Sequence, residues 1–147
     1  MGVRLFRSVD LSEWRRMRNA LWPDQTADDM AAWLGRPDAA VLVADRVSGG
    51  SGVGGELCGF AEVGARSIAE GCTTSPVAYL EGWYVDPDVR RRGVGAALLQ
   101  AVEDWARRAG YRELASDTEL TNQVSQQVHE RQGFTEVERA VHYRKAL

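Results

Sequence analysis

The sequence has few cysteines and no long apolar run, and each shortage excludes a class of protein. Only Cys58 and Cys72 occur in 147 residues, without metal-ligand spacing. We therefore expect reduced thiols, no metal site and a cytoplasmic location. A membrane-spanning helix needs about 20 consecutive apolar residues. The sequence has no such run and no recognisable signal peptide, so we expect no membrane partner.

The sequence also lacks a strong charge of either sign. Its 18 basic and 21 acidic side chains give a net charge of −3, which argues against nucleic acid as the main partner. The small negative charge is compatible with a cationic substrate. With 44% hydrophobic and 27% charged residues, the composition is that of a globular protein, and we expect residues 1–147 to form a single domain.

Hydrophobic periodicity predicts a mixed α/β (α+β) chain. The predicted strands are 3–8, 39–44, 57–63, 77–85, 112–116 and 135–145. The predicted helices are 11–21, 27–34, 94–109 and 122–132. Asp10 and Thr26 are suited to cap the first two helices, and Asn122 or Thr121 to cap the last. Residues 48–55, rich in glycine and serine, are predicted to form a flexible connector.

Residues 81–97 join a strand, a basic glycine-rich loop and the start of a helix. Free N–H groups and the helix dipole at such a helix start favour an anion, and a pyrophosphate fits. The loop is not a Walker A motif, which needs Gly-Lys-Ser/Thr, and it lacks the third glycine of a dinucleotide fingerprint. What remains is R-x-x-G-x-G, with Arg90, Gly93 and Gly95.

This loop resembles the acetyl-CoA pyrophosphate loop of the GCN5-related N-acetyltransferases (GNAT family), and the element order over 3–145 is similar too. The resemblance implies a mixed, mostly antiparallel sheet with splayed central strands and about four helices. It implies that acetyl-CoA lies along residues 83–85 and that a backbone N–H near Tyr84 or Val85 meets the thioester oxygen. The implied cofactor-binding residues are Trp83, Tyr84, Val85, Arg90, Arg91, Arg92, Gly93, Val94, Gly95, Ala96 and Asn122.

Within that family, the chain is similar to the aminoglycoside 6′-N-acetyltransferases. The similarity rests on short motifs spread along the chain, among them 21–23 (LWP), 71–76 (GCTTSP), 80–82 (LEG), 115–118 (ASDT) and 143–145 (YRK). It implies direct transfer of acetyl from acetyl-CoA to the 6′-amine of a polycationic aminosugar, and hence antibiotic resistance. It also implies that the enzyme is a homodimer. Thr73 and Ile68 depart from the pattern, which affects the range of accepted drugs.

Acetyl transfer to an amine needs a group that removes a proton from the ammonium form. Glu81 and Asp117 are the candidates, and the same carboxylates would bind the substrate's ammonium groups. Which of the two is the base stays open. The structural alternatives are a salt-bridged carboxylate for Glu81 and a helix or turn cap for Asp117.

Three further residues have weaker signals, each with a structural alternative. Glu138 is a candidate third anion for the drug, or a solvent-facing strand residue. Trp22 is a candidate wall for a sugar or ammonium group, or core filling at a helix end. His129 lies where many GNAT enzymes have a tyrosine that protonates the leaving thiolate, but the position favours a helix residue that is packed in the core or exposed.

Two other functions remain open from the sequence. One is a GNAT N-acetyltransferase for another amine, such as a polyamine, an amino acid or a protein N-terminus. The other is a non-catalytic acyl-CoA-binding module on the same scaffold, which would need neither Glu81 nor Asp117.

Overall fold

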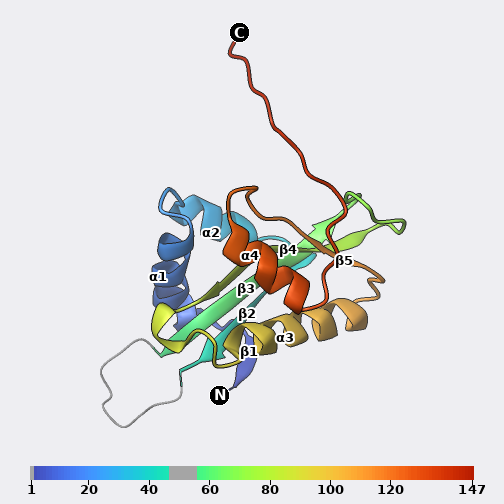
Figure 1. The fold of residues 1–147 in the computed structure, drawn as a ribbon. Coiled ribbons are helices and arrows are strands. Elements are labelled where there is room, and N and C mark those ends of the chain that lie inside the picture. The colour runs from blue at the N-terminus through green and yellow to red at the C-terminus, as the bar shows by residue number, and fades with distance from the viewer. Residues whose placement is uncertain (1, 47–55) are drawn as a thin grey trace.

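The computed structural model describes residues 2–46 and 56–147, so the predicted connector 48–55 lies outside the described residues. Five strands form one sheet in the order β1-β2-β3-β4-β5 (Figure 1). They are β1 (Val3–Leu5), β2 (Ala39–Asp45), β3 (Leu57–Arg66), β4 (Val77–Val85) and β5 (Leu114–Ser116). The first four run antiparallel to their neighbours, and β5 pairs with β4 in parallel.

Four α-helices accompany the sheet: α1 (Leu11–Leu21), α2 (Ala27–Leu34), α3 (Val94–Arg108) and α4 (Gln123–Arg131). Two short 3₁₀ helices, η1 (Ser8–Asp10) and η2 (Pro87–Val89), precede α1 and follow β4. The mixed, mostly antiparallel sheet with four helices confirms the predicted fold. In the described residues no helix is both long and apolar enough to span a membrane.

Helix caps follow the sequence signals at two of the three predicted places. The Thr26 hydroxyl accepts from the backbone N–H of Asp29 at 3.2 Å, and the Asn122 side chain accepts from Ser125 N–H at 3.0 Å. The prediction that Asp10 caps α1 is wrong. Its carboxylate instead accepts from the backbone of Arg7 and from the guanidinium of Arg4, because the chain forms η1 before α1 begins.

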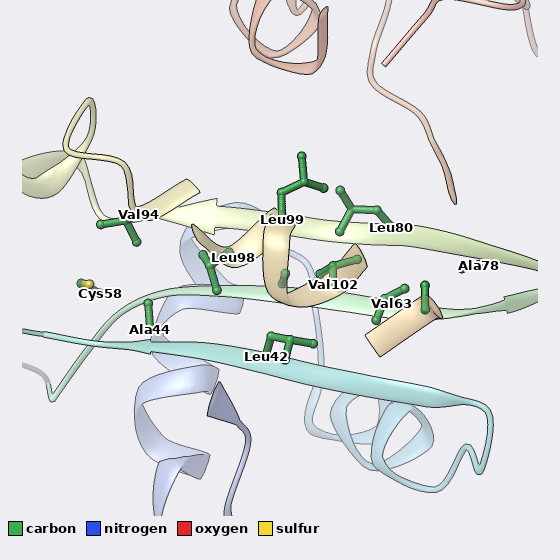
Figure 2. Close-up of a cluster of buried hydrophobic side chains, with 12 residues drawn as sticks. Leu42, Ala44, Cys58, Val63, Ala78, Leu80, Val94, Leu98, Leu99 and Val102 are labelled. Atoms are coloured by element: carbon green, nitrogen blue, oxygen red, sulfur yellow. The ribbon is translucent and has the colours of Figure 1, made fainter. Parts of the chain in front are cut away.

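Two apolar cores lie on the two faces of the sheet, because side chains alternate along each strand. One core lies between the sheet and α3, with Leu98 and Val102 over Leu42 and Val63 (Figure 2). The other lies between the sheet and the first two helices, and is formed by Trp14, Met17, Met30, Val41, Val43, Leu57 and Phe60.

The predicted strand over 135–145 is wrong for the single chain. These residues follow Gly133, which has a positive φ of 97°, and form an exposed tail that runs away from the sheet (Figure 1). A strand requires a neighbour to pair its N–H and C=O groups, and the described part of the chain gives the tail none. Alternation of apolar and polar residues therefore predicted the extended shape but not the partner.

The middle of β4 is where the sheet becomes irregular. Glu62 lies opposite Gly82 while Val63 lies opposite Leu80, so Glu81 is an extra residue, a β-bulge. On its other side β4 pairs with β5 only as far as Leu80. The last five residues of β4, 81–85, therefore continue beyond the end of β5, and this splay positions the site described next.

Candidate functional site

An acidic cleft of about 430 Å³ opens between α1, α2 and the strands β3 and β4. It is lined by Arg18, Trp22, Asp24, Gln25, Asp29, Trp33, Glu62 and Glu81. Four carboxylates and two indole rings thus surround one buried arginine. Carboxylates bind ammonium groups, and aromatic faces attract cations and pack against sugar rings. The lining suits a cationic, sugar-like molecule, as expected from the sequence.

Trp22 forms one wall of this cleft. Its ring packs over Gly82 of β4 so closely that a Cβ at position 82 would lie 2.6 Å from the indole, so only glycine fits there. The guanidinium of Arg18 stacks on the same ring at 4.8 Å from its centroid. Trp22 therefore both fills space at the end of α1 and faces the cleft, and the two interpretations of its role are compatible.

Glu81 lines the cleft and forms a two-point ion pair with Arg66. Its carboxylate oxygens lie 2.6 Å from Nη2 and 3.1 Å from Nε of that guanidinium. Glu81 is thus both the salt-bridged carboxylate considered as its structural alternative and a residue that lines the cleft. The arginine belongs to β3, the strand paired with β4, which explains why the two side chains meet.

Asp117 is joined to Glu81 through two intervening side chains. The Tyr79 hydroxyl donates to the Asp117 carboxylate at 2.5 Å, and the Arg66 guanidinium lies 3.4 Å from the centroid of the Tyr79 ring. Burial, and then this bond to Asp117, raise the pKa of Tyr79 well above its usual value, so it remains a donor. The two candidate carboxylates therefore share one polar network, although Asp117 does not line the cleft itself.

Glu62 and Arg18 are buried in the cleft and were missed by sequence reasoning. Glu62 is 1% exposed, accepts a hydrogen bond from Trp14 Nε1 at 3.1 Å and lies 3.2 Å from Arg18 Nε. Burial raises the pKa of Glu62 to about 7, although the Arg18 charge and the Trp14 bond both oppose this. A lone acidic residue within an apolar strand was the available signal.

A second surface, for the cofactor, follows from the splay of β4. Beyond Leu80 the strand has no β5 residue beside it, so the backbone of residues 83–85 is open for pairing. The Trp83 indole N–H donates to Gly95 O at 3.0 Å and ties β4 to the start of α3. Arg90 Nε donates to Val85 O at 2.9 Å, which occupies one acceptor at the end of that edge.

The loop before α3 fits an anionic group. Gly93 is the N-cap of α3 with φ of +85°, and as a glycine it has no side chain to accept from the first-turn N–H groups. The three atoms nearest to a Cβ at Gly95 would belong to Trp83 and Val85, at 3.7 Å or more. Arg90, Arg91 and Arg92 are exposed beside these N–H groups. Free donors, adjacent cations and the helix dipole together suit a pyrophosphate.

Asp86 anchors the beginning of this loop and was also not predicted. Its buried carboxylate bonds to Arg16 of α1 at 2.9 Å and to Arg46 after β2 at 2.7 Å. Burial alone would raise the pKa of Asp86, but the hydrogen bonds and charges of the two arginines hold that pKa below its usual value. The loop therefore begins from a fixed, ionised residue.

His129 and Asn122 lie on α4, at the side of the splay. His129 Nδ1 donates to Ser125 O at 2.8 Å, Nε2 lies 3.0 Å from Ser116 Oγ, and the ring packs on Trp83. This is the packed helix residue foreseen as one alternative. Asn122 caps α4, whereas Glu138 lies on the exposed tail and the described structure does not bring it to the cleft.

Known proteins are similar to this chain in sequence and in fold over nearly its whole length. The family described as "Acetyltransferase (GNAT) family" matches residues 8–134. The aminoglycoside N(6′)-acetyltransferase type 1 of Klebsiella aerogenes is 45% identical, with 99% of this chain and 96% of that protein covered. The resemblance predicted from the sequence motifs is thereby confirmed.

Two solved structures have the same fold. AAC(6′)-Iy in complex with the bisubstrate analogue CoA-S-monomethyl-acetylneamine has a TM-score of 0.86 and 36% identity, covering 99% of this chain and 98% of that one. The apo aminoglycoside 6′-N-acetyltransferase AAC(6′)-IG from Acinetobacter haemolyticus has a TM-score of 0.87 and 33% identity, covering 100% and 99%.

Proposed function

The chain belongs to the GNAT acetyltransferase family, and from that premise we propose that it acetylates the 6′-amino group of aminoglycoside antibiotics with acetyl-CoA. The acetyl group passes directly to the amine while both substrates are bound. The observation that carries the proposal is the acidic, tryptophan-lined cleft that adjoins the bulge of β4. A cell that contains this activity inactivates the drug, so the biological outcome is antibiotic resistance.

The substrate is held mainly by charge. Asp24, Asp29 and Glu81 line the cleft and bind ammonium groups of the aminosugar, while Trp22 packs against a ring. A hydrogen bond to a charged group is worth about 1.5–3 kcal/mol, so two or three such bonds supply a substantial part of the roughly 8 kcal/mol of a micromolar affinity. A neutral sugar can donate from its hydroxyls but has no ammonium to pair with these carboxylates, which gives the cleft its selectivity for a polycation.

Glu81 and Asp117 are proposed to receive the proton that the amine must lose before it attacks. Glu81 is paired with the guanidinium of Arg66 and lies at the bulge where the cleft meets the open edge of β4. Asp117 is held by Tyr79 at the end of β5. A base next to the bound amine transfers the proton directly or through one water.

The residues beside the splay fit acetyl-CoA, which supplies the activated acetyl thioester when bound. The backbone of residues 83–85 offers pairing groups to an extended pantetheine, and a backbone N–H near Tyr84 or Val85 stabilises charge on the thioester oxygen. Backbone N–H groups of residues 91–96 and the side chains of Arg90, Arg91 and Arg92 hold the pyrophosphate. Asn122, beyond β5, fixes the start of α4 beside this groove.

A thiol-release assay tests the reaction and the two carboxylates together. Wild-type protein with acetyl-CoA and kanamycin is expected to release CoA thiol, and Glu81→Gln and Asp117→Asn to lower kcat/KM by about 10²-fold or more. If the variant has lost the base, the rise of kcat/KM with increasing pH on the acidic side of the profile should disappear. If it has lost only a partner for an ammonium group, mainly KM should rise. Glu103→Gln, at a half-buried position of α3 that pairs with Arg107 and does not line the cleft, is the control and should leave both constants unchanged.

The active molecule is proposed to be a homodimer in which the C-terminal tail pairs with a second copy. Three apolar side chains of the tail are largely exposed: Val137 at 62%, Val141 at 68% and Tyr143 at 93%. The surface of the second copy with which the tail would pair is β5, an edge strand with one neighbour in the sheet. Exposed apolar residues in strand alternation and an open edge in the same chain suit a self-complementary interface.

Pairing of the tail also gives Glu138 a place in the site. The residue is exposed on the tail of the single chain, so any approach to an aminoglycoside depends on where the tail is held. We assign it as a third anion for the drug that is positioned only in the dimer. We further propose that residues 1–147 act as one acetyltransferase domain in the cytoplasm, where acetyl-CoA is available and Cys58 and Cys72 stay reduced.

A further inference from the structure

Glu81 and Asp117, the two proposed proton acceptors, lie where two neighbouring strands stop pairing. Each follows directly after the last pair between β4 and β5, in which Leu80 lies opposite Ser116. Backbone pairing therefore does not fix how the two carboxylates lie relative to one another. Side chains do so instead, because Glu81 contacts Arg66, Arg66 contacts Tyr79, and Tyr79 contacts Asp117.

Tyr79 supplies the contact to Asp117. The tyrosine is 4% exposed, and its hydroxyl donates to Asp117 Oδ2 at 2.5 Å. Asp117 itself is exposed, and among the described residues this hydroxyl is its only hydrogen-bond partner. An exposed side chain without such a partner is free to change rotamer. The buried donor thus holds one carboxylate oxygen and leaves the other, Oδ1, available to a substrate.

Arg66 supplies the contact to Glu81. Its guanidinium binds both carboxylate oxygens, with distances of 2.6 Å from Nη2 and 3.1 Å from Nε, and lies 3.4 Å from the centroid of the Tyr79 ring. The two-point pair fixes the plane of the carboxylate, and the ring fixes the plane of the guanidinium. The Arg66 side chain is 42% exposed, and so exposed an ion pair adds little to stability. A purely structural role does not explain it.

We propose that Tyr79 and Arg66 are positioning residues, which hold Asp117 and Glu81 as one preorganised pair of carboxylates for the reacting amine. The proposal rests on the proposed function, in which these carboxylates bind ammonium groups and receive the proton. Each positioning residue acts through the carboxylate that it contacts. A misplacement of about 1 Å can slow an enzymatic reaction by about 10²-fold, so a small rotation of either carboxylate is enough to affect the rate.

The first test removes the Tyr79 hydroxyl. Tyr79→Phe keeps the ring on which Arg66 stacks, and we expect kcat/KM for kanamycin to fall about tenfold while KM for acetyl-CoA stays within about twofold. In an Asp117→Ala background the same change should have almost no effect, because Tyr79 then has no carboxylate to hold. Tyr111→Phe is the matched control, since Tyr111 also stacks on a ring, Trp105, and its hydroxyl makes no hydrogen bond among the described residues.

The second test changes Arg66. Arg66→Met should also lower kcat/KM for kanamycin about tenfold, but should lower it no further in a Glu81→Ala background. Arg66→Lys keeps the charge without the two-point geometry and should recover only a small part of the loss. Arg36→Met is the matched control, since Arg36 also stacks on an aromatic ring, Trp33, but does not contact Glu81. Thermal unfolding of every variant verifies that it is folded.

Calorimetric binding of kanamycin without acetyl-CoA gives a second readout. Each change should again weaken binding only where its carboxylate is present. Effects that multiply in the double variants would contradict the positioning role, because each residue would then act on its own. Tighter binding of kanamycin by Arg66→Met would also contradict it, because the guanidinium would then be a competitor of the substrate for Glu81. Either result leaves acetylation itself unaffected.

The proposed function and the positioning role fail in different ways. Coupled effects on binding, without acetylation of kanamycin by the wild-type protein, would contradict the proposed function and support the positioning role. A wild-type protein that neither binds nor acetylates kanamycin would overturn both.

Discussion

Glu62 is the side chain whose charge should respond most visibly to pH. Its pKa is about 7 in the folded protein and close to 4.5 in an unfolded chain, so the folded state binds a proton more tightly between these values. The resulting contribution to stability is complete below pH 4.5 and is lost as pH rises through 7. The difference corresponds to about 3 kcal/mol.

Replacement of Glu62 by glutamine should remove this dependence. Glutamine can still accept from Trp14 Nε1 but does not titrate. Urea unfolding at pH 5 and pH 8 is expected to show the variant gaining stability relative to wild type by up to about 3 kcal/mol at the higher pH. Stability curves that stay parallel between the two pH values would show that Arg18 keeps Glu62 ionised throughout.

A site residue could be predicted when it stood in a local sequence motif, but not when its role depends on contact with a residue far along the chain. Trp22 and Glu81 stood in recognisable motifs, and the structure places both in the cleft. Arg18 did not stand out among the neighbouring arginines of α1, because its role comes from contact with Glu62 on a distant strand. A lone glutamate in an apolar strand is visible in a sequence, but the sequence alone does not say what it meets.

Gly93, in the loop between β4 and α3, has a left-handed backbone conformation and also lies where the pyrophosphate is proposed to bind. Comparison with Gly110, which has a similar conformation outside this loop, distinguishes an effect on stability from an effect on cofactor binding. Gly93 and Gly110 lie at opposite ends of α3, with φ of +85° and +91°, and a Cβ at either would meet nothing within 4 Å. Gly93→Ala and Gly110→Ala should therefore each cost about 1–2 kcal/mol of stability, from the left-handed conformation alone.

Only Gly93→Ala should also affect the cofactor. Its new methyl group lies at the N-cap, where the proposed pyrophosphate approaches the backbone, so we expect KM for acetyl-CoA to rise about tenfold while KM for the aminoglycoside stays constant. Steady-state kinetics with each substrate varied in turn, alongside thermal unfolding, measures both effects. A similar rise in Gly110→Ala would mean that α3 instability, rather than the loop, weakens cofactor binding.

Strands and helices were predictable wherever the chain supplies its own partners. The limits of α2 and β4 agree with the predicted 27–34 and 77–85, since amphipathic periodicity and a capping threonine are local signals. The bulge at Glu81 and the splay beyond Leu80 were not visible in periodicity, because both arise from pairing with β3 and β5. The strand predicted at 135–145 is absent for the same reason, because a strand depends on a pairing partner that periodicity does not reveal.

For the whole molecule, the tail determines the proposed dimer. A chain truncated after Phe134 is expected to run as a monomer by size-exclusion chromatography with light scattering, whereas the full chain runs as a dimer. Removal of residues 146–147 alone, beyond the predicted strand, is the control and should leave the dimer intact. The truncated chain keeps both apolar cores and should therefore still unfold cooperatively.

Monomeric full-length protein would contradict the tail interface, as would a dimer that persists without the tail. Loss of Glu138 with the tail predicts a second effect, a raised KM for the drug. A raised KM could come from loss of the Glu138 charge or from loss of the dimer. The variant Glu138→Gln in the full-length protein distinguishes these two causes, because it removes the charge and leaves Val137 and Val141 in place.

The most direct test of acetylation at the 6′ position compares neomycin with paromomycin, which differ in that neomycin has an amine and paromomycin a hydroxyl at that carbon. With acetyl-CoA and purified protein, thiol release is expected with neomycin and not with paromomycin. Equal release from both would contradict the account, because the reacting amine would then lie elsewhere on the drug.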